Sequence, residues 1–299
     1  MDNEKKKALI DAIKTRLSKP MRYYLDLCTR CGLCYDTCHV FYGIPKKEYS
    51  PVGRAEVVRR IYKKHLRPSG KIFPSWGDAK EIDDHAMDEL LDAAFSCTGC
   101  RRCMIHCPFG IDTPFLLSIA KVMLIENGTA PEELTMLADG AVEKGESIGE
   151  FKEGYGEVIR DLEKEVAKRI GAPSSDGLIP LEKKGADILF VGLAGAHSIV
   201  NPAIIFNKAG ANWTLSWFEA VNFGAFLGDP EKMQRIADRV VKEATELGVK
   251  EVVIVECGTA YRIPKFLLGP LPFKVTSIVE VIHRYLKEGK ISIKEKAIA

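Results

Sequence analysis

The sequence predicts an α + α/β protein, with a helical domain over residues 1–172, a linker over 173–186 and a small parallel-sheet α/β domain over 187–299. In the first part, apolar residues recur at the spacing of amphipathic helices. In the last part, short apolar runs alternate with helical patterns, which predicts a parallel sheet with right-handed crossovers. The segment between them is rich in proline, glycine and serine, as linkers are.

Caps and apolar spacing define the expected helices of the first domain. Ser50 followed by Pro51 is typical of a helix start, because serine is a favoured N-cap and proline fits the first turn. Between Asp83 and Cys97 apolar residues recur every three or four positions, so a helix leads directly to that cysteine. Helices are expected over residues 4–18, where Pro20 ends the first one, and over 51–67, 83–96, 113–127, and from Thr129 onward to Ile170.

The α/β domain is read from short apolar runs with helical segments between them. The run Glu-Val-Val-Ile-Val at 251–255 is the clearest strand, because continuous β-branched residues suit a strand buried on both faces. Functional sites in such sheets lie at the carboxyl ends of the strands. The expected strands are 187–193, 213–216, 251–255 and 273–276, and the expected helices are 199–208, 230–247 and 279–286.

Two runs of cysteines share one spacing. The first is Cys28-Thr-Arg-Cys31-Gly-Leu-Cys34-Tyr-Asp-Thr-Cys38, and the second is Cys97-Thr-Gly-Cys100-Arg-Arg-Cys103-Met-Ile-His-Cys107. Both read C-x2-C-x2-C-x3-C, and each cysteine of the second run lies 69 residues after its counterpart in the first. Eight of the nine cysteines of the chain therefore belong to one internal repeat.

This spacing is typical of proteins with two 4Fe–4S clusters, in which the fourth cysteine of each run binds the other cluster. We therefore predict one cluster on Cys28, Cys31, Cys34 and Cys107, and a second on Cys97, Cys100, Cys103 and Cys38. Structural zinc would use four ligands, not two runs of four, and disulfide frameworks belong to small secreted chains. Pro108 follows the second run as the pattern expects, whereas His39 stands at that place in the first. Arg30, Arg101 and Arg102 lie in the loops and are expected to favour the reduced clusters.

Composition and charge restrict the class of protein. The chain has 299 residues, 46% hydrophobic and 28% charged, with a net charge of +2, which is typical of a soluble globular protein. The sequence shows no signal peptide and no apolar run long enough to span a membrane, so we expect a cytoplasmic protein without a transmembrane segment of its own. Attachment to the inner face of the cytoplasmic membrane is the alternative location.

A basic stretch and a lone cysteine remain outside the repeat. The helix over 54–67 carries Arg54, Arg59 and further basic residues, which we interpret as a solvated face or as a docking face for an acidic redox partner or an anionic membrane. Nucleic acid is not expected, because no recognition fold accompanies the charge. Cys257 follows the strand at 251–255, where it is either a packed small residue or a redox-active thiol.

The cysteine runs, the Tyr49-Ser50-Pro51 stretch and the segment Glu256-Cys-Gly-Thr-Ala-Tyr-Arg262 resemble heterodisulfide reductase D-subunit-type iron–sulfur proteins. The resemblance is greatest to the K-type subunits associated with dissimilatory sulfite reductase and to related subunits of transmembrane cytochrome complexes. It implies a degenerate "CCG" domain after the helical ferredoxin domain. Where that family has further cysteines, this chain has Leu193, Asn222-Phe-Gly224 and Ala260, so Cys257 alone cannot hold a third cluster.

The resemblance implies an electron-transfer subunit of a heterodisulfide-reductase-like complex in anaerobic metabolism. Electrons would pass through the two clusters between a membrane cytochrome b or a soluble donor and a thiol–disulfide site on a partner, such as a chain with an intact CCG domain. We expect electron transfer in this chain and not catalysis. The alternatives are an iron–sulfur subunit of a glycerol-3-phosphate or lactate dehydrogenase system, a disulfide reductase that uses Cys257 itself, and an assembly protein with structural clusters.

Overall fold

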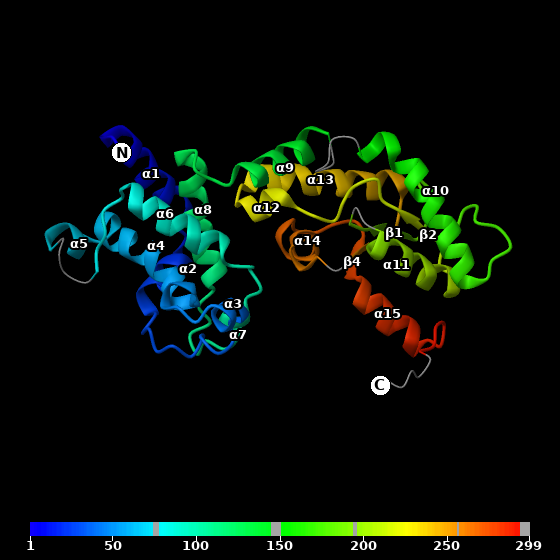
Figure 1. The fold of residues 1–299 in the computed structure, drawn as a ribbon, viewed down its shortest axis with the longest axis horizontal. Coiled ribbons are helices and arrows are strands. Elements are labelled where there is room, and N and C mark those ends of the chain that lie inside the picture. Colours follow the sequence, from blue (N-terminus) through cyan, green and yellow to red (C-terminus); the bar gives the residue numbers. More distant parts are fainter. Residues whose placement is uncertain (74–77, 145–150, 194–195, 256, 294–299) are drawn as a thin grey trace. The chain divides into compact units, whose positions relative to one another are not determined.

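The computed structural model describes residues 1–299 except 74–77, 145–150, 194–195, 256 and 294–299. The chain forms two compact units, one of Met1–Glu132 with Leu227–Asp229 and one of Glu133–Phe226 with Pro230–Ala299 (Figure 1). The first unit is helical and the second contains a parallel sheet, which confirms the predicted α + α/β class. In the described part of the chain, every helix is too short or too polar to cross a membrane.

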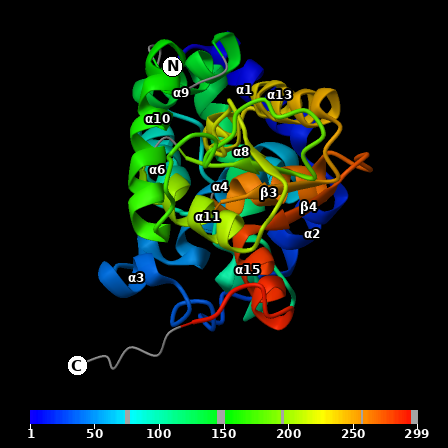
Figure 2. The ribbon, with the colours of Figure 1, turned by 90° about the vertical axis from the view of Figure 1, so that its right-hand side faces the viewer.

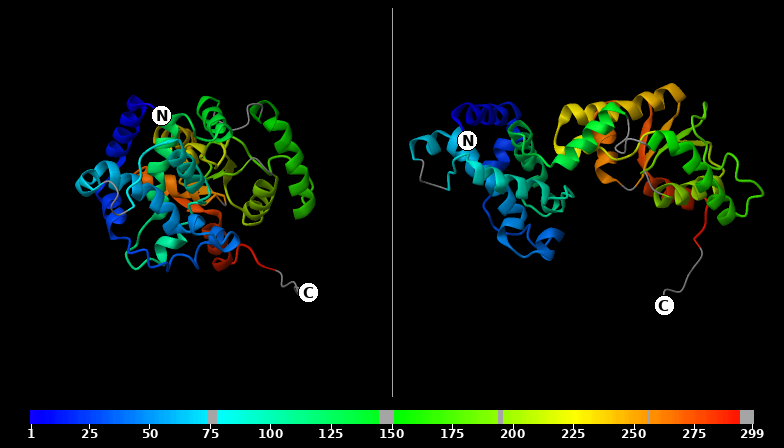
Figure 3. Two further views of the ribbon diagram at one scale, coloured as in Figure 1. Left: turned by 60° about the vertical axis from the view of Figure 1, so that its left-hand side comes forward. Right: turned by 45° about the horizontal axis from the view of Figure 1, so that its top comes forward.

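The first unit is built around α8, which packs against α1, α4 and α6 (Figures 1 and 3). The residues of α8 that are buried there include Leu116, Ile119 and Leu124, which form one core with apolar residues of the other three helices. The elements of this unit are α1 (Asn3–Arg16), α2 (Lys19–Leu27), α3 (His39–Gly43), the short 3-10 helix η1 (Lys47–Tyr49), α4 (Pro51–Leu66), α5 (Pro68–Ile72), α6 (Asp84–Phe95), α7 (Arg102–Ile105) and α8 (Thr113–Asn127).

The segment that leads into Cys28 is itself a helix, α2. Pro20, which was expected only to end the first helix, lies in the first turn of α2. Ser18 is the N-cap, and its hydroxyl accepts a hydrogen bond from the Met21 N–H at 3.4 Å. A proline in the first turn needs no hydrogen-bond partner for its nitrogen, so Pro20 both ends α1 and begins α2.

The start of α4 is fixed by a close approach to η1. The Ser50 hydroxyl accepts a hydrogen bond from the Gly53 N–H at 3.0 Å and donates one to the Lys47 carbonyl at 2.6 Å. A Cβ atom on Gly53 would overlap that same carbonyl oxygen. Glycine is therefore required at position 53, and this contact sets the direction in which the next residue, Arg54, enters the unit.

The second unit contains a four-stranded parallel sheet in the order β2-β1-β3-β4. Helix α11 connects β1 to β2 on one side of β1, and α13 connects β2 to β3 on the other side of β1. Because such crossovers are right-handed, the two helices lie on opposite faces of the sheet (Figures 1 and 2). The elements are α9 (Glu132–Glu143), α10 (Phe151–Ile170), β1 (Ile188–Val191), α11 (Ala196–Lys208), β2 (Trp213–Leu215), α12 (Phe223–Leu227), α13 (Pro230–Leu247), β3 (Glu251–Ile254), α14 (Gly258–Arg262), η2 (Ile263–Leu267), β4 (Lys274–Ser277) and α15 (Ile278–Lys287).

The units divide about 40 residues earlier than the sequence predicts, at Glu132 and Glu133. Helix α10 packs on α11, and its residues Tyr155, Ile159 and Val166 belong to the core of the sheet unit. The segment 173–186 is not a free linker, because Ile179 is buried and its N–H donates to the buried Glu163 carboxylate at 2.9 Å. Amphipathic spacing shows that a helix has an apolar face, but not which core that face covers.

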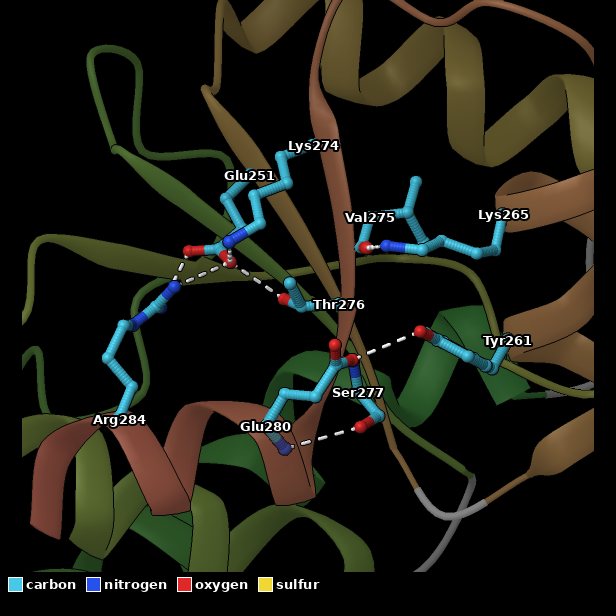
Figure 4. A network of polar contacts seen from close by, with 9 residues as sticks. All are labelled: Glu251, Tyr261, Lys265, Lys274, Val275, Thr276, Ser277, Glu280 and Arg284. Carbon is cyan, nitrogen blue, oxygen red and sulfur yellow. Dashed lines mark hydrogen bonds and ion pairs between the residues drawn. The ribbon is translucent and has the colours of Figure 1, made fainter. Parts of the chain in front are cut away.

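Ionic and polar contacts attach α15 to the sheet (Figure 4). The Glu251 carboxylate on β3 accepts hydrogen bonds from Arg284 Nη1 at 3.0 Å and Nη2 at 2.7 Å, and from the Thr276 hydroxyl on β4 at 2.8 Å. At the start of α15, Ser277 and Glu280 form a capping box, and Tyr261 of α14 donates to the same Glu280 carboxylate at 3.1 Å. These contacts join four elements, β3, β4, α14 and α15, at one side of the sheet unit.

Candidate iron–sulfur centre

The two cysteine loops repeat in conformation as well as in sequence. Two positions in each loop have a left-handed φ: Arg30 (59°) and Gly32 (83°) in the first, Gly99 (70°) and Arg101 (60°) in the second. These are the same two positions of the repeat, 69 residues apart, with glycine and arginine exchanged. Each loop therefore makes the same tight bend, and in each an arginine adopts a backbone conformation that glycine takes without strain.

Each of these loop arginines is paired with a carboxylate on a neighbouring helix. Arg30 donates to Glu56 of α4 through Nε at 2.8 Å and Nη2 at 2.6 Å. Arg101 Nε lies 2.9 Å from the Asp112 carboxylate, which caps α8. Burial opposes ionisation of Glu56, but the hydrogen bond from Arg30 and the charge of Arg59 lower its pKa. Two of the three loop arginines that the sequence suggested would favour reduced clusters, Arg30 and Arg101, are thus paired with acids, which spacing alone does not reveal.

One cavity of the first unit is lined by Cys28, Cys31 and Cys34 of the first run and by Cys107, the last cysteine of the second run. Cys103 of the second run also lines it. Val52 and Ala55 of α4 and the apolar residues Leu33, Phe109 and Ile111 complete its wall. A set of four thiols around one space fits the four iron corners of a 4Fe–4S cluster.

A second cavity is surrounded by Cys97, Cys100 and Cys103 together with Cys38, the last cysteine of the first run. Each cavity is thus lined by three cysteines of one run and by the last cysteine of the other, which is the grouping that an exchange of fourth cysteines would require. Cys103 and Thr113 line both, so the two cavities adjoin. The two cavities differ where α4 lines them, because the first is lined by Val52 and Ala55 and the second by Pro51 and Arg54.

The two runs share an exposed second cysteine, Cys31 and Cys100. The buried thiols are the fourth of the first run, Cys38, and the third of the second, Cys103, and both line the second cavity. Burial raises the pKa of both Cys34 and Cys103 to about 11, so as free groups these thiols would hold their protons at neutral pH. Metal binding must displace those protons, and cluster loading is therefore coupled to the folding of the loops around it.

Two buried arginines of α4 correct the predicted basic face. Arg54 and Arg59 are each only 2% exposed, so neither belongs to a solvated or docking surface. Arg59 donates to the Leu25 carbonyl at 2.7 Å and pairs with Glu56. The signal was present in the sequence, because Arg54 lies four residues before Val58 on the apolar face of the helix.

Cys257 lies in the second unit, immediately before α14, of which it is the N-cap. It follows the carboxyl end of β3, so the predicted position at a strand end is confirmed. The strand order reverses between β3 and its neighbour β1, which is where sites in such sheets lie. Its side chain is half-buried and packs on the core of the sheet unit. Glu256, the first residue of the segment that resembles the heterodisulfide reductase proteins, lies outside the described residues.

Residues 24–111 match the family model of a 4Fe-4S dicluster domain, and the protein is thus a two-cluster iron–sulfur protein. It is 33% identical over 273 residues to the Hdr-like menaquinol oxidoreductase iron-sulfur subunit 2 of Archaeoglobus fulgidus. The aligned region covers 86% of this chain and 48% of that protein. The corresponding iron-sulfur protein of Archaeoglobus profundus is 30% identical over 272 residues, with the same coverage. Over 168 residues, the chain is 25% identical to one of the subunits of the ferredoxin:CoB-CoM heterodisulfide reductase of Methanosarcina acetivorans, covering 56% of this chain and 57% of that one.

These comparisons support a heterodisulfide-reductase-like iron–sulfur family for a chain that carries a 4Fe–4S dicluster domain. It spans about half the length of the curated relatives it matches. No solved structure matches it at a comparable significance.

Proposed function

We propose that Cys28, Cys31, Cys34 and Cys107 bind one 4Fe–4S cluster, and that Cys97, Cys100, Cys103 and Cys38 bind the other. The observation that carries this assignment is the grouping of the eight thiols into two adjoining cavities, each with three cysteines of one run and the last cysteine of the other. The crossed arrangement holds the two loops together and keeps the clusters close, as electron transfer between them requires.

The proposed role is that of an electron-transfer subunit in a heterodisulfide-reductase-like complex. Electrons would travel between a quinol-linked membrane cytochrome b or a soluble donor and a thiol–disulfide site on another chain. The names of the two Archaeoglobus relatives, menaquinol oxidoreductase subunits, support the quinol-linked donor. Relatives of this kind do not favour the glycerol-3-phosphate or lactate dehydrogenase alternative. We propose a cytoplasmic position, in contact with the partner subunits at the inner face of the membrane.

The proposed ligands can be tested on anaerobically purified protein by iron and sulfide analysis and EPR after dithionite reduction. We expect about eight irons per chain, four for each cluster. Crossed ligation is tested by comparing Cys107→Ser with Cys28→Ser and with Cys97→Ser. In the crossed arrangement, Cys107→Ser perturbs the same EPR signal as Cys28→Ser and spares the one that Cys97→Ser removes. If Cys107→Ser instead alters the signal that depends on Cys97, each run holds its own cluster and the assignment is wrong.

The proposed entry of electrons from a quinol-linked donor is tested separately. Cys257→Ser is the matched control among the nine cysteines, because it leaves all eight proposed ligands in place. We expect this variant to retain two clusters and to accept electrons from a reduced quinol analogue, supplied through the purified complex, at the wild-type rate. Reduction of the clusters by a flavin-bearing dehydrogenase with glycerol 3-phosphate or lactate, but not by the quinol route, would contradict the proposal.

A further inference from the structure

Arg54 is a buried arginine at the wall of the second cavity. It is 2% exposed and lies in the first turn of α4, where the contact of Gly53 with η1 fixes its direction. Its Nε donates to the Ser96 hydroxyl at 2.9 Å, and Ser96 immediately precedes Cys97. Its Nη1 donates to Cys38 Sγ at 3.6 Å. The guanidinium therefore contacts the segment before one proposed ligand and the sulfur of another.

The charge of Arg54 has no carboxylate to balance it. Among the described residues, no Asp or Glu oxygen lies within ion-pair distance of its guanidinium, and its buried Nη2 has no hydrogen-bond partner. Three other arginines near the loops are paired, Arg30 and Arg59 with Glu56 and Arg101 with Asp112. A buried cation that lacks a counter-charge is strongly unfavourable, so a protein retains one where a bound anionic group compensates it.

The bound group that would compensate it is the cluster itself. A 4Fe–4S cluster held by four thiolates is anionic, and its potential depends on nearby charge and on hydrogen bonds to its sulfurs. We propose that the Arg54 guanidinium is the buried counter-charge of the cluster held by Cys38, Cys97, Cys100 and Cys103, and that it raises the reduction potential of this cluster. Reduction adds one electron and no proton to the cluster, and the fixed positive charge stabilises the product more than the reactant.

The first cavity has no equivalent of this residue on α4. The residues of α4 that line it are Val52 and Ala55, and the arginine at its wall, Arg30, is paired with Glu56 and 42% exposed at its side chain. One helix thus presents an apolar wall to one cluster and an unpaired cation to the other. We infer that Arg54 makes the two clusters unequal, so that a transferred electron resides preferentially on the second. This inference rests on the ligand assignment proposed above.

The test is a potentiometric titration of both clusters, followed by EPR, in wild-type protein and in Arg54→Gln. In Arg54→Gln we expect the equilibrium constant for reduction of the second cluster to fall at least tenfold, which lowers its potential by ~59 mV for a one-electron couple. The potential of the first cluster should change little. The signal of the second cluster is identified by its absence in Cys97→Ser. Arg59→Gln is the matched control, because it removes the other buried arginine of α4, which does not line either cavity.

Three outcomes with the glutamine variants overturn the inference, and a lysine variant adds a fourth. An Arg54→Gln protein with about eight irons and an unchanged second potential shows that the charge is irrelevant to that cluster. An equal shift in Arg59→Gln shows a general effect of disturbing α4, and an equal fall of both clusters in Arg54→Gln shows that the effect is not specific to the second. If Arg54→Gln fails to retain iron, Arg54→Lys decides, since it keeps the charge but loses the contact with Cys38. We then expect the reduction equilibrium of the second cluster to stay within tenfold of the wild-type value, and a larger fall contradicts the inference.

Failure of the proposed ligands gives a different result. Fewer than two clusters in the wild-type protein, or loss of the same EPR signal in Cys28→Ser and Cys97→Ser, would overturn the assignment before Arg54 is changed. Two intact and distinguishable clusters whose potentials do not respond to Arg54 would leave the assignment in place and remove only the inference.

Discussion

Arg101 Nε lies 2.9 Å from the Asp112 carboxylate and thereby joins the second cysteine loop to the start of α8. Asp112 has two tasks, because it also caps the helix by accepting a hydrogen bond from the Phe115 N–H at 3.1 Å. Burial raises the pKa of this carboxyl, and the charge of Arg101 opposes that rise. The pair balances the charge of Arg101 beside the proposed second cluster.

Asp112→Asn separates these two tasks. Asparagine is as good an N-cap as aspartate, so α8 should keep its start. The variant leaves the charge of Arg101 without its acid, and we therefore expect the potential of the second cluster to rise. The rise should be smaller than ~59 mV, which corresponds to less than a tenfold change in the equilibrium constant for reduction. Potentiometric EPR measures this shift. A fall in that potential, or an equal rise in both clusters, would contradict a local electrostatic effect.

Gly53→Ala should destabilise the first unit. A Cβ atom at this position overlaps the backbone carbonyl of Lys47, which cannot move without displacing η1. Forcing extra volume into a packed site costs typically 1–3 kcal/mol, and we expect a loss of about 2 kcal/mol in unfolding free energy together with reduced iron content. Gly43→Ala is the control, since nothing lies within 4 Å of a Cβ atom built there. Equal iron content and equal denaturant midpoints in the two variants would refute the close-approach argument.

Glu251→Gln tests the anchor of α15. The folded-state pKa of Glu251 is lowered: burial raises it, but the hydrogen bonds from Arg284 and Thr276 outweigh burial. A carboxylate with a lowered folded pKa contributes stability above its ordinary pKa of 4.5, and this stability is lost as the pH falls through the folded value. We expect the variant to lose roughly 1.5–3 kcal/mol at pH 7, as for hydrogen bonds to a charged group.

The difference between Glu251→Gln and wild type should shrink as the pH falls below 4.5. Denaturant unfolding followed by tryptophan fluorescence suits this measurement, because Trp213 and Trp217 lie in the second unit. Lys250→Gln is a control for the loss of an exposed ion pair, which contributes little to stability. A difference that persists unchanged to low pH would show that the contacts of Glu251 do not depend on its charge.

The cysteine spacing predicted the grouping of the eight thiols because ligand spacing is local and chemically strict. The same is true of the sheet, since β-branched runs such as 251–255 have few other structures open to them. The sequence did not place α10, because Ile159 and Val166 show only that the helix has an apolar face. The burial of Arg54 was also not predicted, although its spacing from Val58 places it on the apolar face of α4. The other basic residues of the helix favoured the interpretation of Arg54 as part of a solvated face.

Cys257→Ser distinguishes a structural thiol from a catalytic one. Cys257 is the N-cap of α14 and makes no cap hydrogen bond through its side chain, whereas serine is a favoured N-cap. We expect the variant to keep both clusters and both potentials, with an unfolding free energy equal to that of the wild type or higher by up to about 1 kcal/mol. The measurement is disulfide reduction by the assembled complex, with single-turnover cluster reoxidation as the readout. Reoxidation at the wild-type rate means that electrons leave the clusters without passing through Cys257, and a loss of reoxidation with intact clusters would make this thiol part of the reaction.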